Sequence, residues 1–80
     1  MKNITVIVNF TGLVDIKNIT SGSSVNIQEG TTVSEFLSIL GIIERHKKYI
    51  IVTVGGRTET LFYVLQNSDE VKLFLPVGGG

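Results

Sequence analysis

The sequence contains no cysteine and no tryptophan, and its single proline is Pro76. Without cysteine the chain cannot form a disulfide, a thiolate metal site or a cysteine nucleophile of its own. Seven basic residues balance seven acidic residues, so no strong net field favours binding to nucleic acid or to an anionic membrane. The apolar runs are far too short to span a bilayer. We therefore expect neither a nucleic-acid partner nor a membrane partner.

The length and composition predict one domain, spanning residues 1–80, with one modest core. Hydrophobic residues make up 42% of the chain, which is enough to fold without a bound metal or cofactor. The first residues lead straight into a strand pattern and lack a secretory layout. The sequence therefore predicts a cytoplasmic protein.

Two strands are predicted in the first third of the chain. Apolar residues alternate with polar ones from Ile4 to Phe10, which is typical of a strand with one strongly apolar face. Residues 11–24 are rich in glycine, serine, threonine and asparagine and predict a long connection, part of which packs against the domain. Alternation resumes from Val25 to Gln28 and predicts a second, shorter strand.

A short amphipathic helix follows. Thr32 stands three residues before Glu35, the spacing of a capping box, in which each side chain satisfies a free N–H at the start of a helix. Val33, Phe36, Leu37 and Leu40 then form one apolar helical face. Gly41 is placed to end the helix in a left-handed conformation. The helix has about two turns, so packing must stabilise it.

The second half of the chain predicts a charged loop, a hairpin and a final strand. Residues 44–48 form the loop, 50–54 and 57–60 are strands joined by a glycine-pair turn, and 61–65 are ambiguous. Residues 67–70 form a turn before the last strand, 71–75. We expect an α+β fold, a mixed sheet of four to five strands with one main helix across one face. The first and last strands should be neighbours at its centre because they are the most apolar.

The sequence ends in Gly78-Gly79-Gly80, directly after the last predicted strand. Three consecutive glycines add nothing to a core, and ordering them costs backbone entropy. Because glycine has no Cβ, such a segment can pass through a narrow slot and present its carboxylate to an enzyme. The alternative is a frayed end, since chain termini are often disordered. We expect residues 77–80, the glycine tail, to be flexible.

The chain resembles the prokaryotic ubiquitin-like sulfur carriers, the small subunit of molybdopterin synthase and the thiamine-pathway carrier, over nearly its whole length and most strongly from Ile50 onward. The similarity lies in a strand and hairpin, Val52-Thr53-Val54-Gly55-Gly56, in Leu65 followed by a turn into the last strand, Asp69-Glu70-Val71-Lys72-Leu73-Phe74, and in the ending Pro76-Val77-Gly78-Gly79-Gly80. The sequence departs from the family at Ser68, where the family usually has glycine.

This resemblance implies a β-grasp (ubiquitin-like) fold and a role for the C-terminal carboxylate. Gly80 would be adenylated with ATP by an E1-like activating enzyme, and a sulfur donor would convert it to a thiocarboxylate. Gly79 would complete the glycine pair, with Gly78 one step inside. Phe74, Pro76 and Val77 would meet the activating enzyme or a large synthase subunit. The chain would be a carrier and not an enzyme, with ATP bound by its partner.

Other residues offer weaker candidates for chemistry. His46 lies in the charged run and is interpreted as a solvated loop residue, because no nucleophile accompanies it. Arg45, Lys47 and Lys48 form either a solvated loop or a basic docking patch. Turn and cap roles explain the acidic residues Glu29, Glu35, Asp69 and Glu70 better than catalysis does.

Phe74 lies on the strand face opposite Val71, Leu73 and Leu75. It is either covered by residues of this domain or exposed as an anchor for a partner, and the resemblance favours the anchor.

Three functions stay open. The first is a sulfur carrier for a cofactor pathway, molybdopterin before thiamine. The second is a modifier that is conjugated through Gly80 to lysines of other proteins. The third is a β-grasp binding module whose glycines are inert. A small self-contained enzyme has little support, because no catalytic group is evident in the sequence.

Overall fold

Five strands and two helices form the part of the chain that the computed structural model describes, residues 2–10 and 20–74. The predicted packing of residues within 11–19, part of the long connection, and the predictions for residues 75–80 lie outside these ranges. The elements are β1 (Asn3–Phe10), β2 (Ser23–Gln28), α1 (Val33–Ile39), α2 (Glu44–Lys47), β3 (Ile51–Val54), β4 (Arg57–Thr58) and β5 (Glu70–Phe74).

The strands form one mixed sheet in the order β2-β1-β5-β3-β4. β1 runs parallel to β5, and the other three pairs are antiparallel. The prediction that the first and last strands are central neighbours is confirmed. Their inward side chains explain this position, since Val6, Val8, Val71 and Leu73 have no exposed surface and a central strand is flanked by neighbouring strands on both edges.

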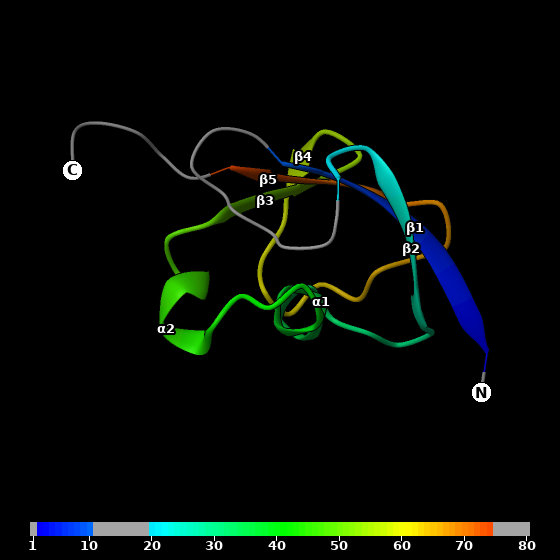
Figure 1. Cartoon of the computed structure of the whole chain (residues 1–80), viewed down its shortest axis with the longest axis horizontal. Helices are drawn as coiled ribbons and strands as arrows, with labels where there is room; N and C mark the ends of the chain where they lie inside the picture. Colours follow the sequence, from blue (N-terminus) through cyan, green and yellow to red (C-terminus); the bar gives the residue numbers. More distant parts are fainter. Residues whose placement is uncertain (1, 11–19, 75–80) are drawn as a thin grey trace.

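Both helices lie on the same side of the sheet, and α1 packs across its middle (Figure 1). Phe36 and Leu37 of α1 are fully buried against the sheet. The core that they complete contains Ile4, Val6, Val8, Ile27, Val33, Phe36, Leu37, Leu40, Val52, Val54, Leu65, Val71 and Leu73. The predicted α+β architecture, a mixed sheet with one main helix on one face, is therefore confirmed.

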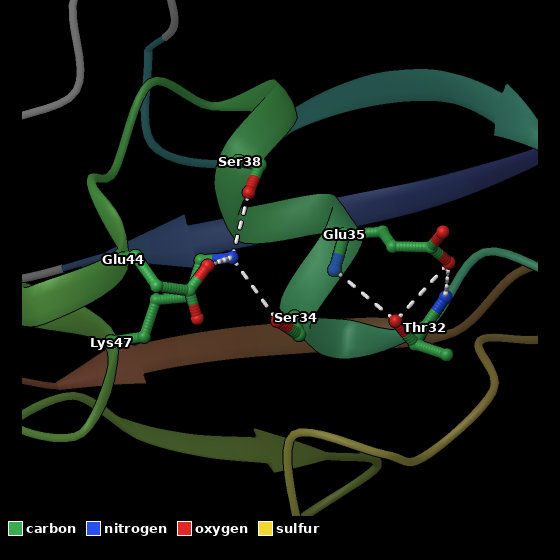
Figure 2. Close-up of polar contacts among 6 residues, drawn as sticks. All are labelled: Thr32, Ser34, Glu35, Ser38, Glu44 and Lys47. Carbon is green, nitrogen blue, oxygen red and sulfur yellow. Dashed lines mark hydrogen bonds and ion pairs between the residues drawn. The ribbon is translucent and has the colours of Figure 1, made fainter.

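The predicted start and end of α1 are both confirmed. The backbone N–H of Glu35 donates to Thr32 Oγ1 at 3.2 Å, and the N–H of Thr32 donates to Glu35 Oε1 at 2.9 Å (Figure 2). At the other end Gly41 has φ +93°, a left-handed conformation that side chains with a Cβ rarely adopt. Local sequence signals therefore set both ends of this helix.

The prediction of a solvated charged loop at residues 44–48 is wrong. Glu44–Lys47 form the short helix α2, and Lys47 is only 3% exposed. Its Nζ donates to Ser34 Oγ at 3.1 Å, to Ser38 Oγ at 2.7 Å and to Glu44 Oε1 at 3.0 Å (Figure 2). Lys47 therefore joins α2 to α1 and belongs to no basic docking patch. His46 is exposed, as predicted, but it lies on α2 and not on a loop.

Two strand boundaries differ by two residues from the predicted ones. β2 begins two residues earlier, at Ser23, and β4 ends at Thr58. The glycine pair forms the predicted hairpin turn, with φ of +59° at Gly55 and +86° at Gly56. The ambiguous residues 61–65 form turns and one bridge, Thr32 to Val64, at the start of α1.

Candidate functional site

Phe74 ends β5 on the face of the sheet that the helices do not cover. Val71 and Leu73 are fully buried in the core, whereas Phe74, one residue beyond, is half-buried on the opposite face. Both helices lie on the core side of the sheet (Figure 1). The face predicted for Phe74 from strand alternation is confirmed, and the residue is partly exposed there.

The structure places Ile51 beside Phe74, a neighbour that the sequence did not predict. The two residues are register partners in the antiparallel pair of β3 with β5. Ile51 is 42% exposed, while Val52 and Val54 point into the core. The sequence did not predict the exposure of Ile51, because residues 50–54 are almost uniformly apolar and their composition does not distinguish the two faces of the strand. The register of the sheet separates them.

A polar row lies next to this apolar pair. Lys72 is the register partner of Asn9 on β1 and of Thr53 on β3, and its side chain is exposed. All three residues lie on the same uncovered face as Phe74, because alternate residues of a strand share a face. We call Phe74, Ile51, Lys72 and Thr53 the β5 face. It offers a partner two apolar side chains with one cation beside them.

Of the residues predicted to form the functional site, Phe74 alone is described by the structure. Pro76, Val77, Gly78, Gly79 and Gly80 follow it in the sequence and lie outside the described residues. The β5 face is therefore the described surface that lies nearest, along the chain, to the predicted glycine tail.

Of the four acidic residues interpreted as turn or cap groups, Glu35 caps α1, Asp69 accepts hydrogen bonds in a turn and Glu29 lies in a turn, whereas Glu70 is the first residue of β5. Asp69 Oδ2 accepts from the N–H of Gln66 at 2.7 Å and from the hydroxyl of Tyr63 at 3.4 Å. Burial, and then the charge of Asp69, raise the pKa of Tyr63. The hydrogen bonds from Thr32 hold the pKa of Glu35 below its ordinary value. These contacts stabilise turns and the start of α1.

Within residues 2–10 and 20–74, no group of three or more histidine or acidic side chains is placed to hold a metal ion. In the same ranges, neither helix has the length and apolar character needed to cross a membrane.

Comparisons with known proteins show similarity at the level of structure. No family model matches the sequence, and no curated protein matches it. Small archaeal modifier protein SAMP1 of Haloferax volcanii has a TM-score of 0.67 at 21% identity, over 95% of this chain and 99% of that one. The HVO 2177 protein of Haloferax volcanii has a TM-score of 0.78 at 20% identity, over 98% and 88%.

A third similar structure is the complex of subunits 1 and 2 of molybdopterin-converting factor from Helicobacter pylori. The matched subunit has a TM-score of 0.57 at 25% identity, over 96% of this chain and 100% of that one. These similarities confirm the β-grasp fold that the sequence resemblance implied. The structures that the chain is similar to include a small archaeal modifier protein and a subunit of molybdopterin-converting factor, and the second belongs to the molybdopterin system that the resemblance named.

Proposed function

We propose that this β-grasp chain is a sulfur carrier that is activated at the carboxylate of Gly80 and delivers sulfur to cofactor biosynthesis, to molybdopterin before thiamine. The observation that carries the proposal is the combination of the fold with the sequence of the last strand. β5 lies in the middle of the sheet, and the sulfur-carrier-like phrase runs through it into Pro76-Val77-Gly78-Gly79-Gly80. The similarity to a subunit of molybdopterin-converting factor supports the same assignment.

The proposed chemistry needs no catalytic group from this chain. A free carboxylate is a poor electrophile, so an oxygen of the Gly80 carboxylate first attacks the α-phosphate of ATP and pyrophosphate leaves. A sulfide equivalent from the donor then attacks the carbonyl carbon, AMP leaves, and the thiocarboxylate is formed. The ATP site belongs to the activating enzyme. Residues 77–80 can span at most roughly 13 Å, and the glycines give that enzyme a backbone without side chains to enclose.

The β5 face is the proposed docking surface for the activating enzyme or for a large synthase subunit. Phe74, which precedes the tail by three residues in the sequence, and its register partner Ile51 supply apolar anchors, and exposed Lys72 supplies a charge at the edge of the contact. Phe74→Ala should weaken binding to the activating enzyme by roughly 1–3 kcal/mol. The free energy of unfolding should change less, because Phe74 is only half-buried. A large loss of stability with unchanged binding would make Phe74 a core residue instead.

A second candidate is conjugation through Gly80 to lysines of other proteins. The similarity to a small archaeal modifier protein favours it. Conjugation begins with the same adenylation, so the two functions separate only after activation. Protein-linked adducts of higher mass in a cell extract, absent when Gly79 and Gly80 are removed, would support the modifier. Transfer of sulfur with no adducts would support the carrier alone.

The experiment that tests the proposal is intact mass spectrometry after incubation with ATP and sulfide. Each adenylating enzyme encoded in the same genome is assayed in turn. One oxygen replaced by sulfur adds about 16 Da, and this shift is the expected result. In parallel, ATP–pyrophosphate exchange measures the adenylation step. Absence of both signals with every such enzyme would reject the carrier and leave a β-grasp binding module.

Gly79→Val is the variant that tests the tail. It keeps the chain length and the carboxylate, but it adds a branched side chain where an enclosing slot would contact the backbone. We expect a folded protein that has lost most of the exchange activity. Thr58→Val adds a valine on exposed strand β4, and this matched control should keep full activity. Full activity of a protein lacking Gly79 and Gly80 would refute the role of the tail.

A further inference from the structure

β2 forms one edge of the sheet, and part of its backbone faces away from β1. The N–H of Thr5 on β1 donates to Asn67 Oδ1 at 2.9 Å, and the Thr5 carbonyl accepts from the N–H of Ser68 at 2.7 Å. Both backbone groups of Thr5 are thus used on the side of β5. Its register partner Asn26 therefore directs its own N–H and C=O outward, since opposed residues of an antiparallel pair share bonds alternately.

The same reasoning applies to Ser24, which precedes Asn26 by two residues on β2. The N–H of Ile7 donates to the Asp69 carbonyl at 2.9 Å, so Ser24, the register partner of Ile7, also directs its backbone groups outward. Ser24 and Asn26 together present two N–H groups and two carbonyls along the edge. This is the pattern to which another strand can pair.

Among the residues that the structure describes, β2 itself has none of the sequence features that usually protect an exposed strand. Charged residues, proline or a very short strand normally prevent unwanted pairing. The opposite edge follows that rule, because β4 has only two residues and one is Arg57. β2 has six residues, Ser-Ser-Val-Asn-Ile-Gln, with neither charge nor proline. An unprotected edge of this length is typical of a strand that takes up a partner.

An open groove of about 510 Å³ lies between this edge and α1. Its lining includes Asn26 and Gln28 from β2, and Glu35, Ser38 and Ile39 from α1. The α1 residues have the spacing of one helical face, and the Ile39 side chain is 57% exposed. Among the lining residues Glu35 has the only charge. The groove therefore combines a backbone edge, one apolar contact and one carboxylate.

We propose that an extended segment of a partner protein pairs with β2 as an additional strand. Two side chains of this partner segment point toward α1. One is apolar and lies against Ile39, and the other is a lysine or arginine that lies beside Glu35. A basic partner segment fits this groove better than a second copy of the chain does. A two-fold β2–β2 pair would bring two Glu35 carboxylates to the same interface, where they repel each other. The proposal does not depend on the proposed sulfur-carrier function.

A defined peptide tests the proposal without an activating enzyme. The probe is the acetylated and amidated peptide Thr-Val-Thr-Lys-Thr-Val-Thr, titrated into the isotope-labelled full chain and followed by NMR. We expect saturable shifts at the amides of Ser24 and Asn26 and at the methyl groups of Ile39. The matched peptide with glutamate in place of lysine should bind more weakly. Absence of shifts at millimolar peptide, or shifts confined to other surfaces, would overturn the proposal.

Three variants assign the binding to this edge. Asn26→Pro removes an outward N–H that the sheet itself does not use, and proline is tolerated at such edge positions; we expect loss of binding with a folded spectrum. Glu35→Gln keeps the acceptor of the capping box but removes the charge. It should weaken the lysine peptide about 2- to 5-fold, the range given by an exposed ion pair, and leave the glutamate peptide no weaker.

Ile39→Ser provides a readout that does not depend on the strand backbone. Ile39 is largely exposed, so the variant should fold even if Asn26→Pro does not, and it should also weaken binding. Analytical ultracentrifugation completes the test. A dimer of the unmodified chain that disappears in either variant would show that β2 pairs with a second copy, and it would overturn the peptide proposal.

Discussion

Phe36 is the side chain whose removal should damage the fold most. It has no exposed surface and lies between α1 and the sheet. Phe36→Ala should cost about 3–5 kcal/mol, because the transfer free energy of the ring is lost and a cavity is left. A domain of eighty residues has a free energy of unfolding of about 4–12 kcal/mol. The variant should therefore lose a large share of its stability.

Urea denaturation followed by circular dichroism measures this loss. With a slope of about 1 kcal/mol per molar urea, the midpoint should fall by about 3 M or more. Ile39→Ala is the matched control, since it lies one turn later on α1 and is 57% exposed. It should cost about 1 kcal/mol or less. A cost below about 1 kcal/mol for Phe36→Ala, or equal costs for the two variants, would refute the placement of α1.

Three further predictions concern Lys47, Ser68 and Glu35. Lys47→Met keeps the buried apolar stem and should lower the free energy of unfolding, measured by urea denaturation, by about 1 kcal/mol or less. Lys47→Ala leaves a cavity and should lower it by about 2 kcal/mol or more. Equal losses would contradict the packing role of the stem. Ser68 has φ +71°, so Ser68→Gly should raise the free energy of unfolding by about 0.5–1 kcal/mol, and a loss would show that its backbone is not strained. The pKa of Glu35 is lowered from 4.5 in the folded chain. The contribution of its carboxylate to the free energy of unfolding is therefore present above that pH and is lost as the pH falls through the folded pKa. A pH series of melts should show this loss in the unmodified chain and not in Glu35→Gln.

Signals within a few residues of one another were sufficient to predict several parts of the protein. The capping box of Thr32 and Glu35 and the left-handed Gly41 set the ends of α1. The alternation of β5 placed Phe74 on the face opposite the core. These features depend on contacts or backbone conformations that are local to the chain, so the sequence expresses them directly.

Tertiary structure decided the features that join distant segments. Lys47 looked like part of a solvated loop, but its ammonium reaches Ser38 and Ser34, nine and thirteen residues away along the chain. Burial of such a cation is tolerated because several oxygen atoms accept its hydrogen bonds. Ile51 joined Phe74 through the register of β3 with β5. The outward backbone of Asn26 followed from how Thr5 is bonded to the turn at Asn67 and Ser68. Local periodicity specifies which face of a strand a residue occupies, whereas only the assembled sheet specifies its neighbours across the strands.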